Sequence, residues 1–159
     1  MSAVIQLTDF HISTLQMEFT EPAIDGDVQI VASKSGFDYT VSKKRDHDLS
    51  YRMKLIFRFQ EVDTHDKPIG CMLKIAIVGF FQFPKETDEE NRAKLIRLNG
   101  VSILYGILRG VVGTVSGLQP GGRVTLPAIM PNEIVAMVEA GKQKRQEAVT
   151  EAPAAEQTP

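Results

Sequence analysis

Two stretches in which apolar and polar residues alternate constrain this chain more than any other feature. The first covers 50–60 and the second 69–83, and a polar segment from Asp63 to Pro68 separates them. A period of two places alternate side chains on opposite faces of a β-strand, and a short polar segment rich in turn-forming residues is typical of a hairpin loop. We therefore expect two long antiparallel strands, each with one buried face.

Two further strands are predicted nearer the N-terminus. The apolar phase of 10–19 changes at Ser13 and Thr14, which predicts one long strand with a β-bulge or bend at this point. Another strand is expected within 27–44, where aromatic and polar residues alternate. Together with the first pair, these segments predict a four-stranded antiparallel meander.

After these strands the pattern acquires the period of a helix. Thr87 and Glu90 have the spacing of a capping box. Asn99–Gly100 predicts a break or kink, and 101–117 a strongly apolar helix. A proline-containing loop then leads to Pro131, which suits the first turn of a final helix ending near residue 147. Strands followed by two helices predict an α+β fold.

The apolar segment 101–118 allows three interpretations. A membrane span needs about 20 apolar residues, and the central Arg109 would cost at least ~2.5 kcal/mol. A buried core helix is the second interpretation. The third is an oligomer interface, because glycines recur four residues apart and each costs about 1 kcal/mol in a helix unless a close contact compensates. We favour the third, without membrane insertion, and predict these interface residues: Gly106, Arg109, Gly110, Gly113 and Gly117.

Length and charge place further limits on the chain. Its 159 residues, 43% of them hydrophobic, suit a single domain, which we place at 1–145. The segment 146–159 carries Glu but no Lys or Arg and is rich in Ala and Pro, so we expect a disordered acidic tail. A net charge of −2 argues against non-specific nucleic-acid binding. The first residues lack the basic and apolar regions of a secretory signal, which favours the cytoplasm.

No arrangement of catalytic residues can be recognised. His11, His47 and His65 lie in three separate segments, and Cys71, the single cysteine, is in phase with apolar neighbours. A buried thiol in such a strand is inert. We therefore predict no enzyme activity, no metal site and no cofactor, and favour a binding protein.

Four motifs, in their order and spacing, resemble the SecB family of protein-export chaperones. The segment Ile103–Arg109, Ile-Leu-Tyr-Gly-Ile-Leu-Arg, resembles the Ile-Leu-Phe-Pro-Tyr-Ala-Arg that opens the family's long first helix. Val124–Met130 is similar to the loop that follows this helix. Leu15–Pro22 resembles an early strand of the family, and Gly79–Phe83 the Gly-aromatic end of its fourth strand. The resemblance covers residues 5–137.

The resemblance implies a bacterial, cytoplasmic, ATP-independent holdase. SecB-type subunits assemble as dimers of dimers through the long first helix, hold unfolded preproteins in apolar grooves and pass them to the SecA ATPase. Flexible apolar side chains bind many clients without reading their sequence. The client-binding residues that the resemblance implies are Phe37, Tyr39, Phe80, Phe81, Phe83, Leu126, Ile129, Met130, Ile134 and Val135. Of these, we expect Tyr39 and Met130 to be exposed, since they lie in an edge strand and a loop.

The outer sheet face departs from the family. Familiar members dock SecA through carboxylates on this face, and the matching positions here are Gln16, Thr20 and Lys74. The neighbouring strand exposes Arg52, Lys54 and Arg58 beside them. A basic face would repel a partner that an acidic face attracts. We therefore expect a SecB-like holdase whose handoff partner is not SecA or is absent. The alternatives are a chaperone dedicated to one client, such as an antitoxin, and an oligomeric structural or regulatory module that binds no client.

Overall fold

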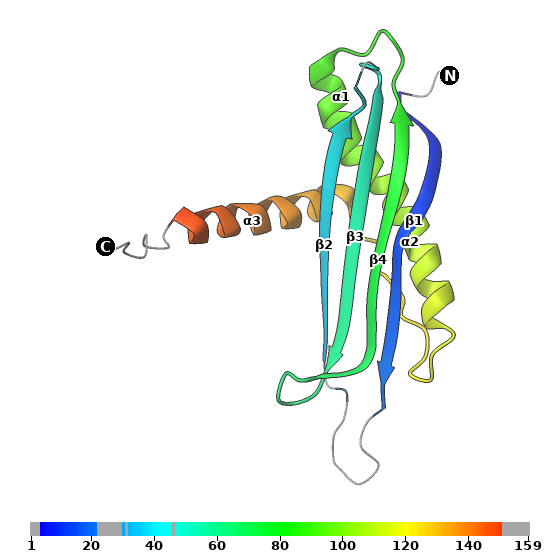
Figure 1. Cartoon of the computed structure of the whole chain (residues 1–159), viewed down its shortest axis with the longest axis vertical. Helices are drawn as coiled ribbons and strands as arrows, with labels where there is room; N and C mark the ends of the chain where they lie inside the picture. Colours follow the sequence, from blue (N-terminus) through cyan, green and yellow to red (C-terminus); the bar gives the residue numbers. More distant parts are fainter. Residues whose placement is uncertain (1–3, 22–29, 31, 46, 151–159) are drawn as a thin grey trace, which may run out of the picture.

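In the computed structural model, helices cover one face of a four-stranded antiparallel sheet (Figure 1). The structure describes residues 4–21, 30, 32–45 and 47–150, with the backbone alone for 144–150. The strands are β1 (Gln6–Thr20), β2 (Ala32–Lys43), β3 (Ser50–Val62) and β4 (Pro68–Gln82). The helices are α1 (Glu89–Leu95), the π-helical turn η1 (Ile96–Gly100), α2 (Val101–Ser116) and α3 (Pro131–Thr150).

The strand order is β1-β4-β3-β2. The strands β2, β3 and β4 form the predicted meander, but β1 pairs with β4 and not with β2, so the prediction of a meander over all four strands is wrong for β1. The register joins Phe37 to Phe57 and Phe57 to Ile75, so these three side chains share one face. Both β1 and β2 are edge strands.

The predicted alternation of β3 and β4 is confirmed. Met53, Leu55 and Phe57 are fully buried, as are Ile75 and Ile77 on β4. The predicted irregularity of β1 is also confirmed, because its register with β4 shifts between Ile12 and Thr14. A bulge of this kind moves the following side chains to the other phase without ending the strand.

The helical segment after the sheet begins one residue later than predicted. Asp88, and not Thr87, is the N-cap: its side chain accepts a hydrogen bond from the backbone N–H of Asn91 at 2.9 Å. The predicted break at Asn99–Gly100 is the π-helical turn η1, which joins α1 to α2. Gly100 lies close to the sheet at this turn, since a Cβ there would be 3.1 Å from Met53 Sδ.

The helix α2 closes the core over the sheet. Leu104, Leu108 and Val112 are fully buried in the cluster that contains the inner side chains of β3 and β4. By length and mean hydropathy (1.4), the continuous helical segment Glu89–Ser116 could cross a membrane. Its buried face nevertheless packs on the sheet, as expected of a core helix.

The helix α3 begins at Pro131, as predicted, and leaves the body beside β2 (Figure 1). Ile134 is fully buried and Val138 is 5% exposed, so the first half of α3 is packed on the core. The helix continues to Thr150, beyond the predicted start of the tail. Residues 151–159 of that predicted tail lie outside the described residues.

Candidate functional site

The structure divides the predicted client-binding residues by depth. Most of them belong to the core cluster or pack against it. The buried members are Tyr39, Phe81, Phe83, Leu126 and Ile134, and the partly buried ones are Phe37, Phe80, Ile129 and Val135. Met130 is 63% exposed, as predicted. Five of these aromatic and aliphatic side chains therefore support the fold and are closed to a client in the single chain.

The prediction that Tyr39 is exposed is wrong, because α3 lies across the edge strand β2. Tyr39 is 5% exposed, and its hydroxyl donates to Glu139 Oε1 at 3.3 Å. Lys142 Nζ lies 4.6 Å from the centroid of the Tyr39 ring and donates to its backbone oxygen at 2.9 Å. Burial, with a further effect of Glu139, raises the pKa of Tyr39. This neutral phenol helps hold α3 on the sheet.

The loop between α2 and α3 is fixed by two side chains of α2. The Tyr105 hydroxyl donates to Pro127 O at 2.6 Å, and Arg109 Nε donates to Leu126 O at 3.2 Å. Leu126 thereby joins the core cluster, and Ile129 packs against it. Phe80 is separate from this group: it lies on the outer face of the sheet, where its ring is 5.8 Å from that of His11.

An open groove lies between the α1–η1 segment and α3. Its volume is about 400 Å³, and we name it the α1–α3 groove. The residues that line it are Glu90, Ala93, Lys94, Arg97, Leu98, Val135 and Glu139. Leu98 is 42% exposed. Val135 was predicted from the sequence, whereas Leu98 was not. The only signal for Leu98 was the Asn99–Gly100 break, which becomes the π-helical turn that carries it.

The α1–α3 groove combines apolar side chains with charged rims. Ala93, Leu98 and Val135 supply the apolar part. On the rim, Lys94 Nζ lies 2.8 Å from Glu90 Oε1, and Arg97 Nη1 lies 3.8 Å from Glu139 Oε1 across the groove. Paired charges leave little net field, so such a groove binds by apolar contact and not by charge selection. It suits the apolar side chains of an extended peptide.

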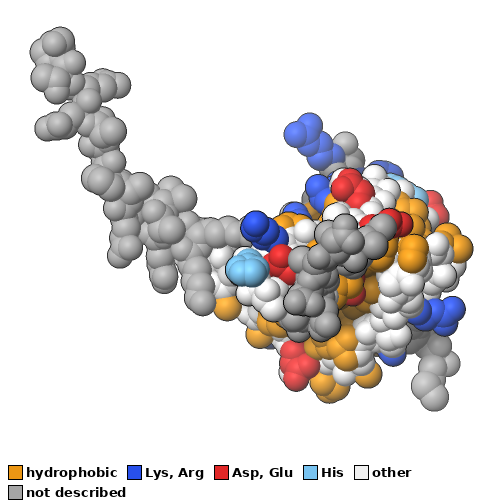
Figure 2. All heavy atoms as spheres, turned by 90° about the horizontal axis from the view of Figure 1, so that it is seen from below, with side chains coloured by type: hydrophobic (Ala, Val, Ile, Leu, Met, Phe, Trp, Pro, Cys, Tyr) orange, Lys and Arg blue, Asp and Glu red, His pale blue; other side chains and the backbone are white. Residues whose placement is uncertain are grey.

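A second exposed apolar surface runs along β1, and we name it the β1 strip. It consists of Phe10, Ile12, Leu15 and Met17, which are 45%, 41%, 52% and 37% exposed. Their register partners Ile75 and Ile77 are fully buried. The helix α2 crosses the same sheet diagonally (Figure 1). Apolar side chains gather in patches on the lower end of the molecule in Figure 2. Aligned apolar patches on a surface mark interaction sites.

The predicted interface glycines of α2 face outward. A Cβ added at Gly106 or Gly110 would meet nothing within 4 Å, and at Gly113 only Arg123 Cδ at 3.9 Å. Together with Arg109, they line an open hollow of about 370 Å³ beside the loop 123–126. Gly117 forms the C-cap of α2. This face of α2 is thus open to another backbone in the single chain.

The predicted docking residues all belong to the outer face of the sheet. Lys74 pairs with Gln16 on one side and with Arg58 on the other, and Thr20 lies opposite Gly70. Arg52 and Lys54 follow along β3, in the phase opposite to the buried residues. The structure thus brings the basic side chains, Arg58 among them, together on one face.

The described residues contain no group of three or more His, Cys, Asp or Glu side chains that could hold a metal ion. Cys71 is fully buried, and this burial, with an effect of Glu61, raises the pKa of its thiol to about 11. A thiol with such a pKa is protonated near neutral pH and a poor nucleophile.

Comparison with known proteins finds similarity to solved structures. No protein-family model matches the sequence, and neither does any curated protein. The chain is similar to the SecB-like chaperone Rv1957 of Mycobacterium tuberculosis, solved in complex with a ChAD peptide from the HigA1 antitoxin Rv1956. The TM-score is 0.62 at 14% identity, over 79% of this chain and 90% of that chain. The chain has a SecB-like fold. The predicted SecB-like α+β architecture is confirmed. The α1–α3 groove, the β1 strip and the basic outer face are all surfaces of this fold.

Proposed function

We propose that this protein is an ATP-independent chaperone that binds unfolded polypeptides and keeps them from aggregating. The observation that carries the proposal is the α1–α3 groove, whose apolar side chains remain accessible in a folded chain with a closed core. Unfolded chains expose scattered apolar residues, and an open apolar groove with paired charges at its rim binds them without reading their sequence. The proposed action is non-enzymatic and takes place in the cytoplasm.

Leu98 and Val135 are the proposed central client contacts. Leu98 stands on the π-helical turn and Val135 on the first turns of α3, so one apolar side chain of a client can touch both. Met130, 63% exposed just before α3, is proposed to extend the contact beyond the groove. The unbranched Met side chain adapts to differently shaped clients. The buried residues Tyr39 and Ile134 support α3, which forms one side of the groove, because Tyr39 bonds to Glu139 and Ile134 is packed in the core.

Self-association is part of the proposal. The β1 strip and the glycine face of α2 are two separate exposed surfaces, and two such surfaces are what a dimer of dimers requires. Partly exposed apolar side chains on an edge strand favour a subunit contact, since a long free edge exposes unpaired backbone groups. We assign the glycine face, which permits close helix contact, to the second interface.

The range of clients distinguishes two versions of this function. Rv1957 was solved with a peptide from an antitoxin, which favours a chaperone dedicated to a single client as the second version. The basic outer face of the present chain argues against handoff to SecA through that face. Binding of several unrelated unfolded proteins would support a general holdase, and binding of only one would support the dedicated version.

A refolding assay with groove variants tests the proposal. A denatured, slow-folding protein is diluted into buffer with or without the chaperone, and light scattering reports its aggregation. We expect the wild type to suppress scattering without ATP and Leu98→Gln to lose much of this effect. Leu118→Gln is the matched control, because Leu118 is 80% exposed and lies outside the groove.

Two results would contradict the proposal. If the wild type leaves the scattering of several clients unchanged and binds no hydrophobic dye while folded, the protein is an assembly module. If Leu98→Gln and Leu118→Gln reduce activity equally, the groove is not the client site. Circular dichroism of both variants ensures that a loss of activity is not a loss of fold.

A further inference from the structure

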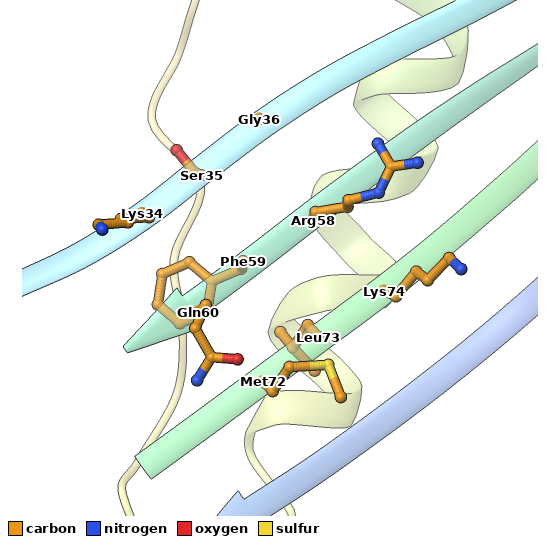
Figure 3. A pocket seen from close by; sticks show the side chains of 9 residues that line it. All are labelled: Lys34, Ser35, Gly36, Arg58, Phe59, Gln60, Met72, Leu73 and Lys74. Atoms are coloured by element: carbon orange, nitrogen blue, oxygen red, sulfur yellow. The ribbon is translucent and has the colours of Figure 1, made fainter. Parts of the chain in front are cut away.

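The outer face of the sheet carries a row of cations that none of the described helices covers. We name Arg52, Lys54, Arg58 and Lys74 the basic stripe. The first three follow one another along β3 on the same face, and Lys74 of β4 stands directly opposite Arg58. The ribbon of the helix passes behind the strands that carry Arg58 and Lys74 in Figure 3. The stripe therefore lies on the other face of the sheet from the core.

The stripe is not neutralised within the described chain. Its four side chains form no ion pair with another described residue, whereas Lys34, Lys43 and Lys142 each have an acidic partner. Like charges that face each other across two strands destabilise a sheet. Arg58 and Lys74 are such a pair. An anionic ligand would relieve this repulsion as well as pair with the stripe.

Two hollows lie at the ends of the stripe. The Gly36 hollow, of about 310 Å³, is bordered by Lys34, Arg58 and Lys74, and it forms where β2 has no side chain (Figure 3). A Cβ at Gly36 would meet nothing within 4 Å. The second hollow is also about 310 Å³ in volume; it is lined by Phe80 and bordered by Lys44 and Arg52. We name it the Phe80 hollow. Each hollow thus places apolar surface beside cations.

We propose that the basic stripe binds an extended acidic segment of a partner protein. The segment places one apolar side chain in each hollow and its carboxylates over the stripe between them. At about 3.3 Å per residue, the rows of Arg52 and Arg58 are ~20 Å apart, which an extended peptide of about seven residues spans. The charge of the stripe selects Asp and Glu, and the hollows select for apolar residues at both ends of the acidic run.

This site is separate from the α1–α3 groove. The groove lies among the helices and the stripe on the opposite face, so a client and an acidic partner can bind at the same time. An acidic peptide suits the site better than a nucleic acid, because the chain has a net charge of −2 and the Phe80 ring already contacts His11.

Fluorescence anisotropy with a labelled peptide tests the site. The peptide has a Leu near each end and alternating Asp and Glu between them, and the full chain is titrated into it at low and at high salt. We expect binding at low salt that weakens steeply as the ionic strength rises. Arg58→Glu combined with Lys74→Glu should weaken binding roughly tenfold or more. Lys67→Glu combined with Lys85→Glu changes the net charge equally and should leave binding near the wild-type value.

Two further variants separate binding from stability. Gly36→Ala adds a Cβ that meets nothing within 4 Å, so it should narrow the hollow and weaken peptide binding while the salt dependence of binding stays the same. Lys74→Gln should weaken binding and leave the melting temperature equal or higher, because it removes the repulsion with Arg58. A residue with a merely structural role would lower the melting temperature.

Several results would overturn the proposal. Equal loss of binding in the Lys67/Lys85 control would show that only net charge matters. Equal affinity for a single-stranded oligonucleotide would show that the stripe does not prefer an acidic peptide. Equal affinity for a peptide with Ser in place of Leu would show that the hollows do not bind apolar side chains. Dissociation of an oligomer by the Arg58/Lys74 variant would assign the face to a second copy of the chain. Suppression of aggregation should be unchanged in this variant, so that failure here is distinguishable from failure of the proposed chaperone activity.

Discussion

Replacing Gly106 and Gly110 of α2 with alanine tests whether a second subunit covers this helix face. In the single chain, a Cβ at either position meets nothing within 4 Å. Alanine is favoured over glycine in an exposed helix by about 0.8–1.0 kcal/mol. On a free face, the two substitutions should therefore stabilise the fold by ~2 kcal/mol and raise the melting temperature by roughly 4–8 °C at this chain length.

We expect the opposite, because the glycine face is proposed to pack against another subunit. Two added methyl groups would separate the helices and weaken the association. The variant should elute as a smaller species in size-exclusion chromatography with light scattering. The melting temperature of the variant should fall, and it should no longer depend on protein concentration.

Gly141 of α3 supplies the matched control. A Cβ there also meets nothing within 4 Å, and the position lies on a different helix. Gly141→Ala should raise the melting temperature slightly without changing the oligomeric state. The contrary result is that the Gly106/Gly110 variant behaves like this control, with a melting temperature that rises by roughly 4–8 °C at every protein concentration. In that case α2 has no partner, and the assembly proposal is wrong for this face.

Three further expectations concern the fold. Gly79→Ala should destabilise the protein by about 1–3 kcal/mol in urea unfolding, because the new Cβ would stand 2.7 Å from Leu104 Cδ2; an unchanged midpoint would contradict this packing. Cys71, with a thiol pKa of about 11, should react with a maleimide near pH 8 only after denaturation, so rapid labelling of the native protein would show that the core opens. The Asn91 N–H lowers the pKa of Asp88, so the cap stabilises α1 above the unfolded-state pKa and is lost as the pH falls through the lower folded-state pKa. Asp88→Ala should therefore lower the melting temperature at neutral pH and have no effect near pH 2; an equal loss at both values would exclude the carboxylate as the cause.

Most of the helices and strands could be predicted from the sequence. An element that is buried on one face repeats its apolar residues at a fixed period, and this period can be read directly along the chain. The alternation in β3 and β4 and the phase change at Thr14 depend only on which side of the sheet each residue faces. The position of β1 could not be predicted in this way. An edge strand carries the same period whether it lies beside β2 or beside β4, and the choice depends on contacts far apart in the chain, such as Phe10 with Gly79.

The site was less predictable than the fold. Tyr39 lies on an edge strand, and its burial depends on α3, whose path over β2 no local pattern reveals. Leu98 reaches the α1–α3 groove through a π-helical turn, and Asn99–Gly100 indicated only that the helix is irregular there. The basic stripe was predictable in part, since Arg52, Lys54 and Arg58 share one phase, but its meeting with Lys74 needed the register of β3 and β4.

The pairing of β1 with β4 also has a consequence for biosynthesis. The strands β2, β3 and β4 can form from local hairpins, whereas β1 leaves the ribosome first and finds its partner only when Gly70 to Gln82 has been made. Contacts between residues so distant in the chain form slowly. Until then Leu7 and Phe19, which pack against the core in the folded chain, are exposed in a nascent chain without a closed sheet. Each new copy of the protein therefore passes through an aggregation-prone state during its own synthesis, of the kind that chaperones bind.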